Sequence, residues 1–264
     1  MPPAKRKPRT YNFDKTRTAV RTQFDAVRKG VEALTPEQLA APTRLGDWTV
    51  RELAAHITMA SSAVARGLAA AGQDKAELRP QDWPMTSAPY AEDIDAYVHA
   101  LAADNDLATL YAEAAQGLER ALAEHDGEAP VANRTGHMKL ADYLVTRTVE
   151  LIVHTDDLNA AVPGLDIPYD RQALAACTRV LADALATKAP GASTEVRIPP
   201  FAVVQCVEGP RHTRGTPPNV VETDPLTWIR LATGRLPWAT AVDEALVSAS
   251  GERADLAGLL PIMA

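Results

Sequence analysis

Apolar residues recur every three or four positions along most of the first 190 residues of the chain. Such spacing is typical of amphipathic α-helices that pack against one another. We therefore predict a bundle of five helical segments, the third of which contains a break. The segments cover residues 13–33, 50–71, 92–125, 139–161 and 171–187.

Local sequence marks the start of the second segment. Thr49 and Glu52 are the ends of an S/T-x-x-E capping box, which satisfies free backbone N–H groups at a helix N-terminus. The helix is therefore expected to begin directly after Trp48. Residues 72–90 follow it with three prolines and one tryptophan, and they predict a long loop that lines or covers a site.

The pattern changes after residue 188, where short alternating apolar runs predict β-strands. Asp224 and Pro225 predict the N-cap and first position of a helix that ends before Gly234. Strands are expected at residues 195–198, 201–207, 220–221 and 246–250, and a last helix at residues 254–260.

These elements predict an α+β fold in two domains. Residues 1–12 are expected to form a basic disordered tail, residues 13–188 a helical bundle, and residues 189–264 a small α/β domain.

Composition and charge exclude several classes of protein. With 264 residues, of which 46% are hydrophobic, the chain can bury a sizeable core, while a net charge of -7 opposes general attraction to nucleic acid. The exception is the basic start, with Lys5, Arg6, Lys7 and Arg9, which is typical of a solvated terminus. No signal peptide or membrane span is evident. We expect a cytoplasmic monomer or homodimer that binds neither nucleic acid nor membrane.

The segment 139–161 carries the most informative pattern. Four leucines fall in one narrow stripe of the helical wheel and predict its buried face. Four ionisable residues lie beside that stripe, where a purely structural helix carries Leu, Val or Ala. Such groups need partners when buried: each other, water or a cation. The leucines are Leu140, Leu144, Leu151 and Leu158, and the ionisable residues are Arg147, Glu150, His154 and Asp157.

Glu150 and His154 are one helical turn apart, so that one metal ion can contact both side chains. His56 flanks the apolar face of the segment 50–71 and supplies a third ligand if the two segments are neighbours. Two histidines and one carboxylate form a catalytic zinc set, in which the ion lowers the pKa of a bound water or thiol. Arg147 and Asp157 would then orient the ligands and balance the charge.

Periodicity alone leaves a second interpretation equally open. Arg147 and Glu150 would form a buried ion pair, His154 would hydrogen-bond nearby, and His56 would be a satisfied core histidine. The sequence also lacks the His-Glu-x-x-His form of the metalloproteases.

Two longer motifs carry a family resemblance. Residues 46–56, Gly-Asp-Trp-Thr-Val-Arg-Glu-Leu-Ala-Ala-His, resemble the W-T-V-R-x-L-x-x-H segment of the mycothiol-dependent maleylpyruvate isomerase family, a branch of the DinB-like helical bundles. Residues 147–158 are similar to the R-x-x-E-x-x-x-H-x-x-D-L segment of that family. The resemblance covers roughly residues 13–165 and implies that His56, Glu150 and His154 bind zinc.

The remaining residues are similar to the C-terminal domain of these proteins. The resemblance implies a DinB-like four-helix bundle followed by a small α/β sterol-carrier-like domain. In the family this domain supplies an arginine near the active site. Arg235 is the first candidate for that arginine and Arg230 the second, while a cation at a helix C-terminus is an equally open interpretation of Arg235.

The resemblance implies a metal-dependent enzyme that activates mycothiol, or a similar small thiol, for addition to a small electrophilic substrate. Zinc, or another divalent metal, would bind the thiol as thiolate. Addition to the cis double bond of a maleylpyruvate-like compound, rotation and elimination would give the trans product, and thiol transfer is the other reaction. Cys177 and Cys206 have no ligand spacing, and mycothiol brings its own sulfur. An arginine would pair with a substrate carboxylate.

Two other functions stay open. The first is a binding protein without catalysis, whose C-terminal domain carries an apolar ligand as sterol carriers do and whose bundle holds no tight metal. The second is a metal-dependent hydrolase that uses zinc-bound water in place of a thiol.

Overall fold

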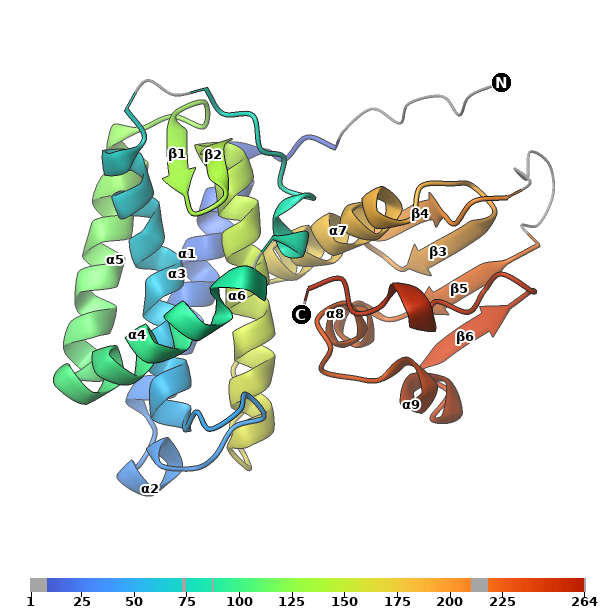
Figure 1. Ribbon diagram of the computed structural model, residues 1–264. Coiled ribbons are helices and arrows are strands. Elements are labelled where there is room, and N and C mark those ends of the chain that lie inside the picture. Colours follow the sequence, from blue (N-terminus) through green and yellow to red (C-terminus); the bar gives the residue numbers. More distant parts are fainter. Residues whose placement is uncertain (1–8, 73–74, 87, 210–217, 264) are drawn as a thin grey trace. The chain divides into compact units, whose positions relative to one another are not determined.

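The computed structural model describes residues 9–72, 75–86, 88–209 and 218–263 (Figure 1). The lysines and arginine of the predicted tail, Lys5, Arg6 and Lys7, lie outside the described residues. The chain forms two compact units. The first, called the bundle unit here, contains residues 12–80 and 89–174; the second, the C-terminal unit, consists chiefly of residues 175–264 and includes residues 81–88.

Four long helices build the bundle unit, and they lie within the first four of the five predicted segments (Figure 1). One of them, α3, packs against α5, α6 and the shorter helix α4, while α1 packs against α6 and α5. The predicted break in the third segment is present at Asn105 and Asp106, because Asn105 is extended and Asp106 caps α5. The helices are α1 (Phe13–Glu32), α2 (Pro36–Leu39), α3 (Val50–Ala70), α4 (Ala91–Asp104), α5 (Leu107–Glu124) and α6 (Leu140–Ala161).

The capping box at the start of α3 is confirmed. The backbone N–H of Thr49 donates to the Glu52 carboxylate over 2.7 Å, and the Thr49 hydroxyl hydrogen-bonds to the same oxygen. These bonds fix the first turn of α3. Without them the N-terminal end of the helix would fray toward His56, which lies about two turns further along.

The helix α6 is buried on nearly all sides and not only along the predicted leucine stripe. Helices and the small hairpin surround it, so Arg147, His154, Asp156 and Asp157 are buried together with the leucines. Its buried threonine hydroxyls donate to carbonyls one turn earlier, as Thr155 does to Leu151 over 2.6 Å. The sequence pattern therefore underestimated how central this helix is.

A two-stranded hairpin, β1 (Pro130–Asn133) and β2 (Gly136–Lys139), was not predicted. It packs on α3 at Gly67, where a Cβ atom would lie 2.6 Å from the Ala132 carbonyl oxygen. The predicted loop 72–90 also meets it, because the backbone N–H groups of Glu77 and Leu78 donate to the His137 carbonyl. Two short 3-10 turns, η1 (Trp83–Met85) and η2 (Ala88–Tyr90), lie in that segment.

The helix α7 (Arg171–Lys188) crosses the division between the units, which falls after Leu174. The domain boundary predicted from the sequence lies after residue 188 instead. Side-chain bonding explains the difference, since Arg179 on α7 donates to the Phe201 carbonyl over 3.0 Å and its guanidinium lies over the Phe201 ring.

The C-terminal unit contains a four-stranded sheet in the order β4-β3-β5-β6. The strand β3 pairs antiparallel with β4 and parallel with β5, and β5 pairs antiparallel with β6. Alternate residues are buried, as in β4, so that the sheet has one packed face. The strands are β3 (Thr194–Ile198), β4 (Ala202–Cys206), β5 (Val220–Thr223) and β6 (Val247–Ser250).

Two shorter helices lie in the described part of the C-terminal unit, and the sequence predicts only the first. The predicted helix α8 (Pro225–Ala232) begins as expected, because Asp224 accepts from the N–H groups of Leu226 and Thr227. The helix α9 (Trp238–Asp243) was not predicted. The helix expected at residues 254–260 is wrong: only the 3-10 turn η3 (Ala257–Leu259) forms, because Leu260 is extended before Pro261.

No described helix combines the length and apolar composition needed to cross a membrane. The fold class is confirmed: a helical domain is followed by a small α/β domain.

Candidate metal centre

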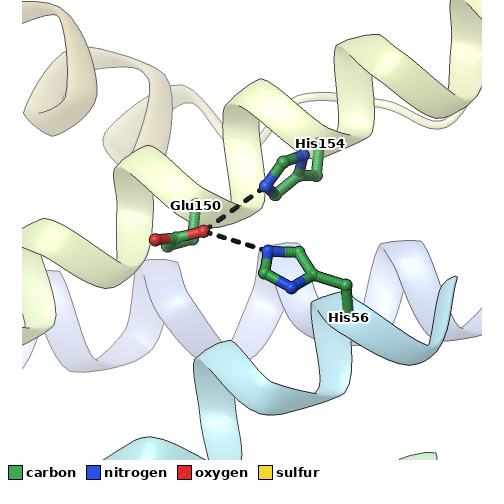
Figure 2. A group of neighbouring side chains, drawn as sticks. All are labelled: His56, Glu150 and His154. Atoms are coloured by element: carbon green, nitrogen blue, oxygen red, sulfur yellow. Dashed lines mark ion pairs between the residues drawn. The ribbon is translucent and has the colours of Figure 1, made fainter. Parts of the chain in front are cut away.

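The packing of α3 against α6 brings three predicted ligands together (Figure 2). A carboxylate oxygen of Glu150, Oε2, lies 3.6 Å from Nε2 of His56 and 3.4 Å from Nε2 of His154. The two imidazole rings are perpendicular, with centroids 4.8 Å apart. One ligand atom from each residue lies within 4.8 Å of the others.

These separations match a small divalent ion better than direct hydrogen bonds. Hydrogen bonds between nitrogen and oxygen are shorter, about 2.7–3.2 Å. Ligand atoms around a tetrahedral zinc ion, with bonds of about 2.1 Å, lie about 3.4 Å apart. The side chains of His56, Glu150 and His154 are only 13%, 15% and 10% exposed, so they are already largely removed from water.

His56 lacks the partner that an ordinary buried histidine has. Among the residues that the structure describes, no group hydrogen-bonds to its buried Nδ1, and its Nε2 faces Glu150 at 3.6 Å. Its ring instead packs against Trp48, with centroids 5.0 Å apart. The alternative of a satisfied core histidine is therefore not what the structure shows, and an orphaned imidazole fits a ligand.

Arg147 lies at the other side of the glutamate. Its Nη2 is 4.0 Å from Oε1 of Glu150, at the long limit of an ion pair, and its guanidinium lies 4.6 Å from the centre of the Tyr143 ring. Its Nε donates to the Thr146 hydroxyl over 3.1 Å. The guanidinium is thus held beside the ligands, where it offsets the charge of Glu150.

Asp157 orients His154 by contacting the ring nitrogen that faces away from Glu150. Its Oδ2 lies 2.9 Å from Nδ1 of His154, so that Nδ1–H donates to the carboxylate and Nε2 faces Glu150. A carboxylate in this position is the usual outer partner of a metal-bound histidine.

Arg44 and Asp156, which the sequence did not predict as site residues, extend this chain of contacts. Arg44 donates from Nε to Asp157 over 2.6 Å and from Nη2 to Asp156 over 2.5 Å. Asp156 also accepts from the Tyr169 hydroxyl. Two adjacent aspartates on a buried helix signal that a cation must approach from elsewhere, but no periodic pattern points to Arg44.

Burial and neighbouring charges shift the pKa values of Glu150 and His56, but not that of His154, in the direction that a metal site needs. Burial would raise the pKa of Glu150, but His154, His56 and Arg147 outweigh it and hold that pKa well below its ordinary value. Burial lowers the pKa of His56 more than Glu150 raises it. For His154, Asp157 and Glu150 outweigh burial and raise the pKa. Glu150 is therefore ionised and His56 neutral at neutral pH, as ligands must be.

A second group of possible ligands is exposed. Nε2 of His99 lies 3.5 Å from Asp47 and 3.7 Å from Asp95, whose side chains are 81% and 51% exposed. Water competes with any ion at such a site, so the buried group is the candidate metal centre.

Both cysteines are buried in the C-terminal unit. Burial raises the pKa of Cys206 to about 11 and raises that of Cys177 further. Both thiols are therefore protonated at neutral pH, so that neither is a nucleophile.

Arg235, the predicted catalytic arginine, follows α8 in the C-terminal unit and donates from Nη1 to the Thr233 carbonyl over 2.8 Å. Arg230 lies in the last turn of α8. A catalytic role for either arginine stays a prediction.

Comparison with known proteins supports the family resemblance. Residues 20–159 match the family model described as the mycothiol maleylpyruvate isomerase N-terminal domain, and residues 170–262 match a model described as a bacterial SCP ortholog. No curated protein matches the sequence significantly. A crystal structure of the mycothiol-dependent maleylpyruvate isomerase is similar in fold, with a TM-score of 0.61 and 17% identity over 94% of this chain and 97% of that one.

A histidine-to-alanine variant of the same isomerase gives a TM-score of 0.58 and 16% identity over the same shares of the two chains. At this identity the solved structures establish the fold alone. The family model, however, covers more than half of the chain, including His56, Glu150 and His154. The chain therefore belongs to the mycothiol maleylpyruvate isomerase family.

Proposed function

We propose that this protein is a metal-dependent enzyme that activates mycothiol, or a similar small thiol, for addition to a small electrophilic substrate. The observation that carries the proposal is the buried group of two imidazoles and one carboxylate in a chain of this family. The solved relatives are named as mycothiol-dependent isomerases, which favours cis–trans isomerisation of a maleylpyruvate-like compound over thiol transfer.

His56, Glu150 and His154 would hold the ion, and zinc suits their donor atoms. When bound, zinc supplies a positive charge that keeps a thiol deprotonated near neutral pH. The protein would contribute the orientation of His154 through Asp157 and the cationic Arg147 beside Glu150. We also propose that Arg235 pairs with a substrate carboxylate.

The nucleophilic sulfur must come from outside the chain, because Cys177 and Cys206 are buried and protonated. In the proposed reaction the sulfur adds to one carbon of the cis double bond, the remaining single bond rotates, and the sulfur leaves as the trans double bond forms. The thiol is regenerated, and no oxidant or reductant is needed. A location in the cytoplasm and a monomeric or homodimeric state stay predictions.

Elemental analysis of the purified protein tests the metal site. We expect about one zinc ion per wild-type chain after dialysis against a weak chelator, and its loss in His56→Ala and His154→Ala. The matched control is His99→Ala, which removes an imidazole from the exposed group and is expected to keep the zinc. A wild-type protein that takes up no metal, even after zinc is offered back, contradicts the proposal.

The reaction is tested by incubating the zinc-loaded enzyme with maleylpyruvate and mycothiol and following the two isomers by NMR. We expect the trans isomer to form only when both thiol and metal are present. Mass spectrometry separates the two thiol reactions, because transfer leaves sulfur in the product whereas isomerisation does not. Cleavage of the substrate that needs the metal but no thiol would instead indicate a hydrolase that uses metal-bound water.

A second function is favoured by one observation, the match of residues 170–262 to the bacterial SCP ortholog model. On this alternative the C-terminal unit binds an apolar ligand. Titration with a fluorescent fatty acid tests it: saturable binding that His154→Ala leaves unchanged would support a binding function separate from the metal site.

A further inference from the structure

A short loop between α2 and α3, residues 41–49, interacts with both histidines of the candidate metal centre. It contacts His56 directly and His154 through Asp157. The loop is closed by its own backbone bonds. The N–H of Val50 donates to the Ala41 carbonyl over 2.9 Å, and both the N–H and the hydroxyl of Thr43 donate to the Trp48 carbonyl. These bonds make the 41–49 loop a defined structure and not an open connection.

The first contact between the loop and the metal centre is made by Arg44, which acts on His154 through the carboxylate of Asp157. The guanidinium bonds to Asp157 and Asp156 over 2.6 Å and 2.5 Å, and Asp157 accepts from Nδ1 of His154. Asp157 is fully buried, and the charge-assisted bond from Nε of Arg44 restricts the rotation of its carboxylate. The carboxylate is therefore held where it keeps Nε2 of His154 directed at Glu150.

The second contact is made by Trp48, whose ring packs against the ring of His56. Its indole N–H donates to Asp95 over 2.7 Å, which fixes the ring plane. The ring lies against the His56 imidazole, with centroids 5.0 Å apart and planes inclined by 52°. Because no described residue hydrogen-bonds to Nδ1 of His56, ring packing takes over the orienting role that Asp157 has for His154.

We infer that the 41–49 loop sets the metal-binding orientation of both histidines, with Arg44 and Trp48 as positioning residues. The inference rests on the proposed function, since it concerns the same metal. One loop thereby aligns ligands from two separate helices, so a change in the loop alters metal affinity without touching a ligand. Outer partners of metal-bound histidines typically contribute about 10- to 100-fold to affinity.

The test compares zinc affinity in Arg44→Gln, Trp48→Leu and wild type, measured by competition with a chromophoric chelator. We expect each variant to bind zinc about 10- to 100-fold more weakly. The matched control is Arg51→Gln, because Arg51 lies in the first turn of α3 but donates only to the carbonyls of Ala102 and Asn105 in its described hydrogen bonds. It is expected to leave the affinity unchanged.

Two further readouts separate positioning from general loss of stability. The absorption spectrum of the cobalt-substituted protein reports ligand geometry, and we expect it to change in Arg44→Gln and Trp48→Leu but not in Arg51→Gln. The conservative variants Trp48→Phe and Arg44→Lys, which keep the ring or one charge, are expected to recover part of the affinity.

Failure of this inference can be distinguished from failure of the proposed function. A wild-type protein without zinc affinity overturns the proposed function and this inference with it. A wild-type protein that binds zinc, beside Arg44→Gln and Trp48→Leu variants with unchanged affinity and cobalt spectra, overturns the inference alone, even if their unfolding temperatures fall.

Discussion

Two clusters of the bundle unit contain similar side chains in different surroundings. The buried cluster of His56, Glu150 and His154 and the exposed cluster of Asp47, Asp95 and His99 each bring imidazole and carboxylate groups within 4.8 Å. In the first, the side chains are at most 15% exposed, whereas in the second Asp47 is 81% exposed. Proximity of donor atoms is therefore common to both clusters.

Burial and support make the difference. Each histidine of the buried cluster contacts an outer partner, Asp157 or Trp48, that orients its ring. The ion pairs described for His99 join it to carboxylates at 3.5 to 3.8 Å, and its side chain is 38% exposed to water. Ligands that are dehydrated and oriented before the ion arrives bind it more tightly, because less ordering remains.

The strongest test of the comparison is the stabilisation that zinc provides. At a free zinc concentration about 100-fold above the dissociation constant, binding adds about 2.7 kcal/mol to the free energy of unfolding. We expect thermal unfolding of the wild type to shift upward by about 5–10 °C on zinc addition. The shift should vanish in His154→Ala and persist in His99→Ala. A shift that persists in His154→Ala and vanishes in His99→Ala would mean that the exposed cluster holds the ion.

A smaller effect is expected when the buried charges lose their cation in the metal-free protein. Arg44→Gln leaves Asp156 and Asp157, which are 2% and 0% exposed, without the guanidinium that they share. Removing one partner of a buried ion pair costs about 3–5 kcal/mol, and we expect about 2 kcal/mol here because Arg44 is 30% exposed. Urea unfolding followed by circular dichroism measures the change.

The control for that measurement is Asp47→Asn in the exposed cluster. Exposed ion pairs contribute little, so the free energy of unfolding should change by less than about 0.5 kcal/mol. If the two substitutions destabilise the protein equally, burial does not distinguish the clusters.

The sequence predicted much of this site because its signals are local. The spacing of Glu150 and His154 is one helical turn, and the capping box sets the start of the helix that carries His56. The prediction of three ligands also assumed that this helix packs against α6, and the structure shows that it does. The metal role of the three residues stays a prediction.

What the sequence could not show depends on contacts between distant residues. Arg44 meets Asp157 across 113 positions of the chain, and no period or motif relates a loop arginine to a helix aspartate at that distance. The hairpin β1–β2 was missed because only one residue of each four-residue strand is buried, so that no alternating apolar pattern marks either strand. The division between the units differs from the predicted domain boundary because α7 has an unbroken helical pattern, and periodicity cannot mark a division inside a helix.

Glu52 offers the finest test, because it lies between the clusters. It caps the helix that carries His56, and its Oε1 is 3.8 Å from Nδ1 of His99. Burial would raise the pKa of Glu52, but hydrogen bonds from Thr49 and the charge of His99 outweigh it and lower that pKa. A carboxyl group whose pKa is lower in the folded state stabilises the protein above its unfolded pKa, and this contribution is lost as the pH falls through the folded pKa.

Glu52→Ala is therefore expected to cost about 1 kcal/mol at pH 7, as for a lost cap, and less as the pH falls below about 4. Urea unfolding of both proteins between pH 3 and pH 7 measures the difference. Zinc affinity of the variant should stay within about threefold of wild type, because Trp48 and not Glu52 contacts the His56 ring. A cost that does not change with pH would show that the cap acts through packing alone, and a large loss of zinc affinity would show that the two clusters are coupled through the first turn of α3.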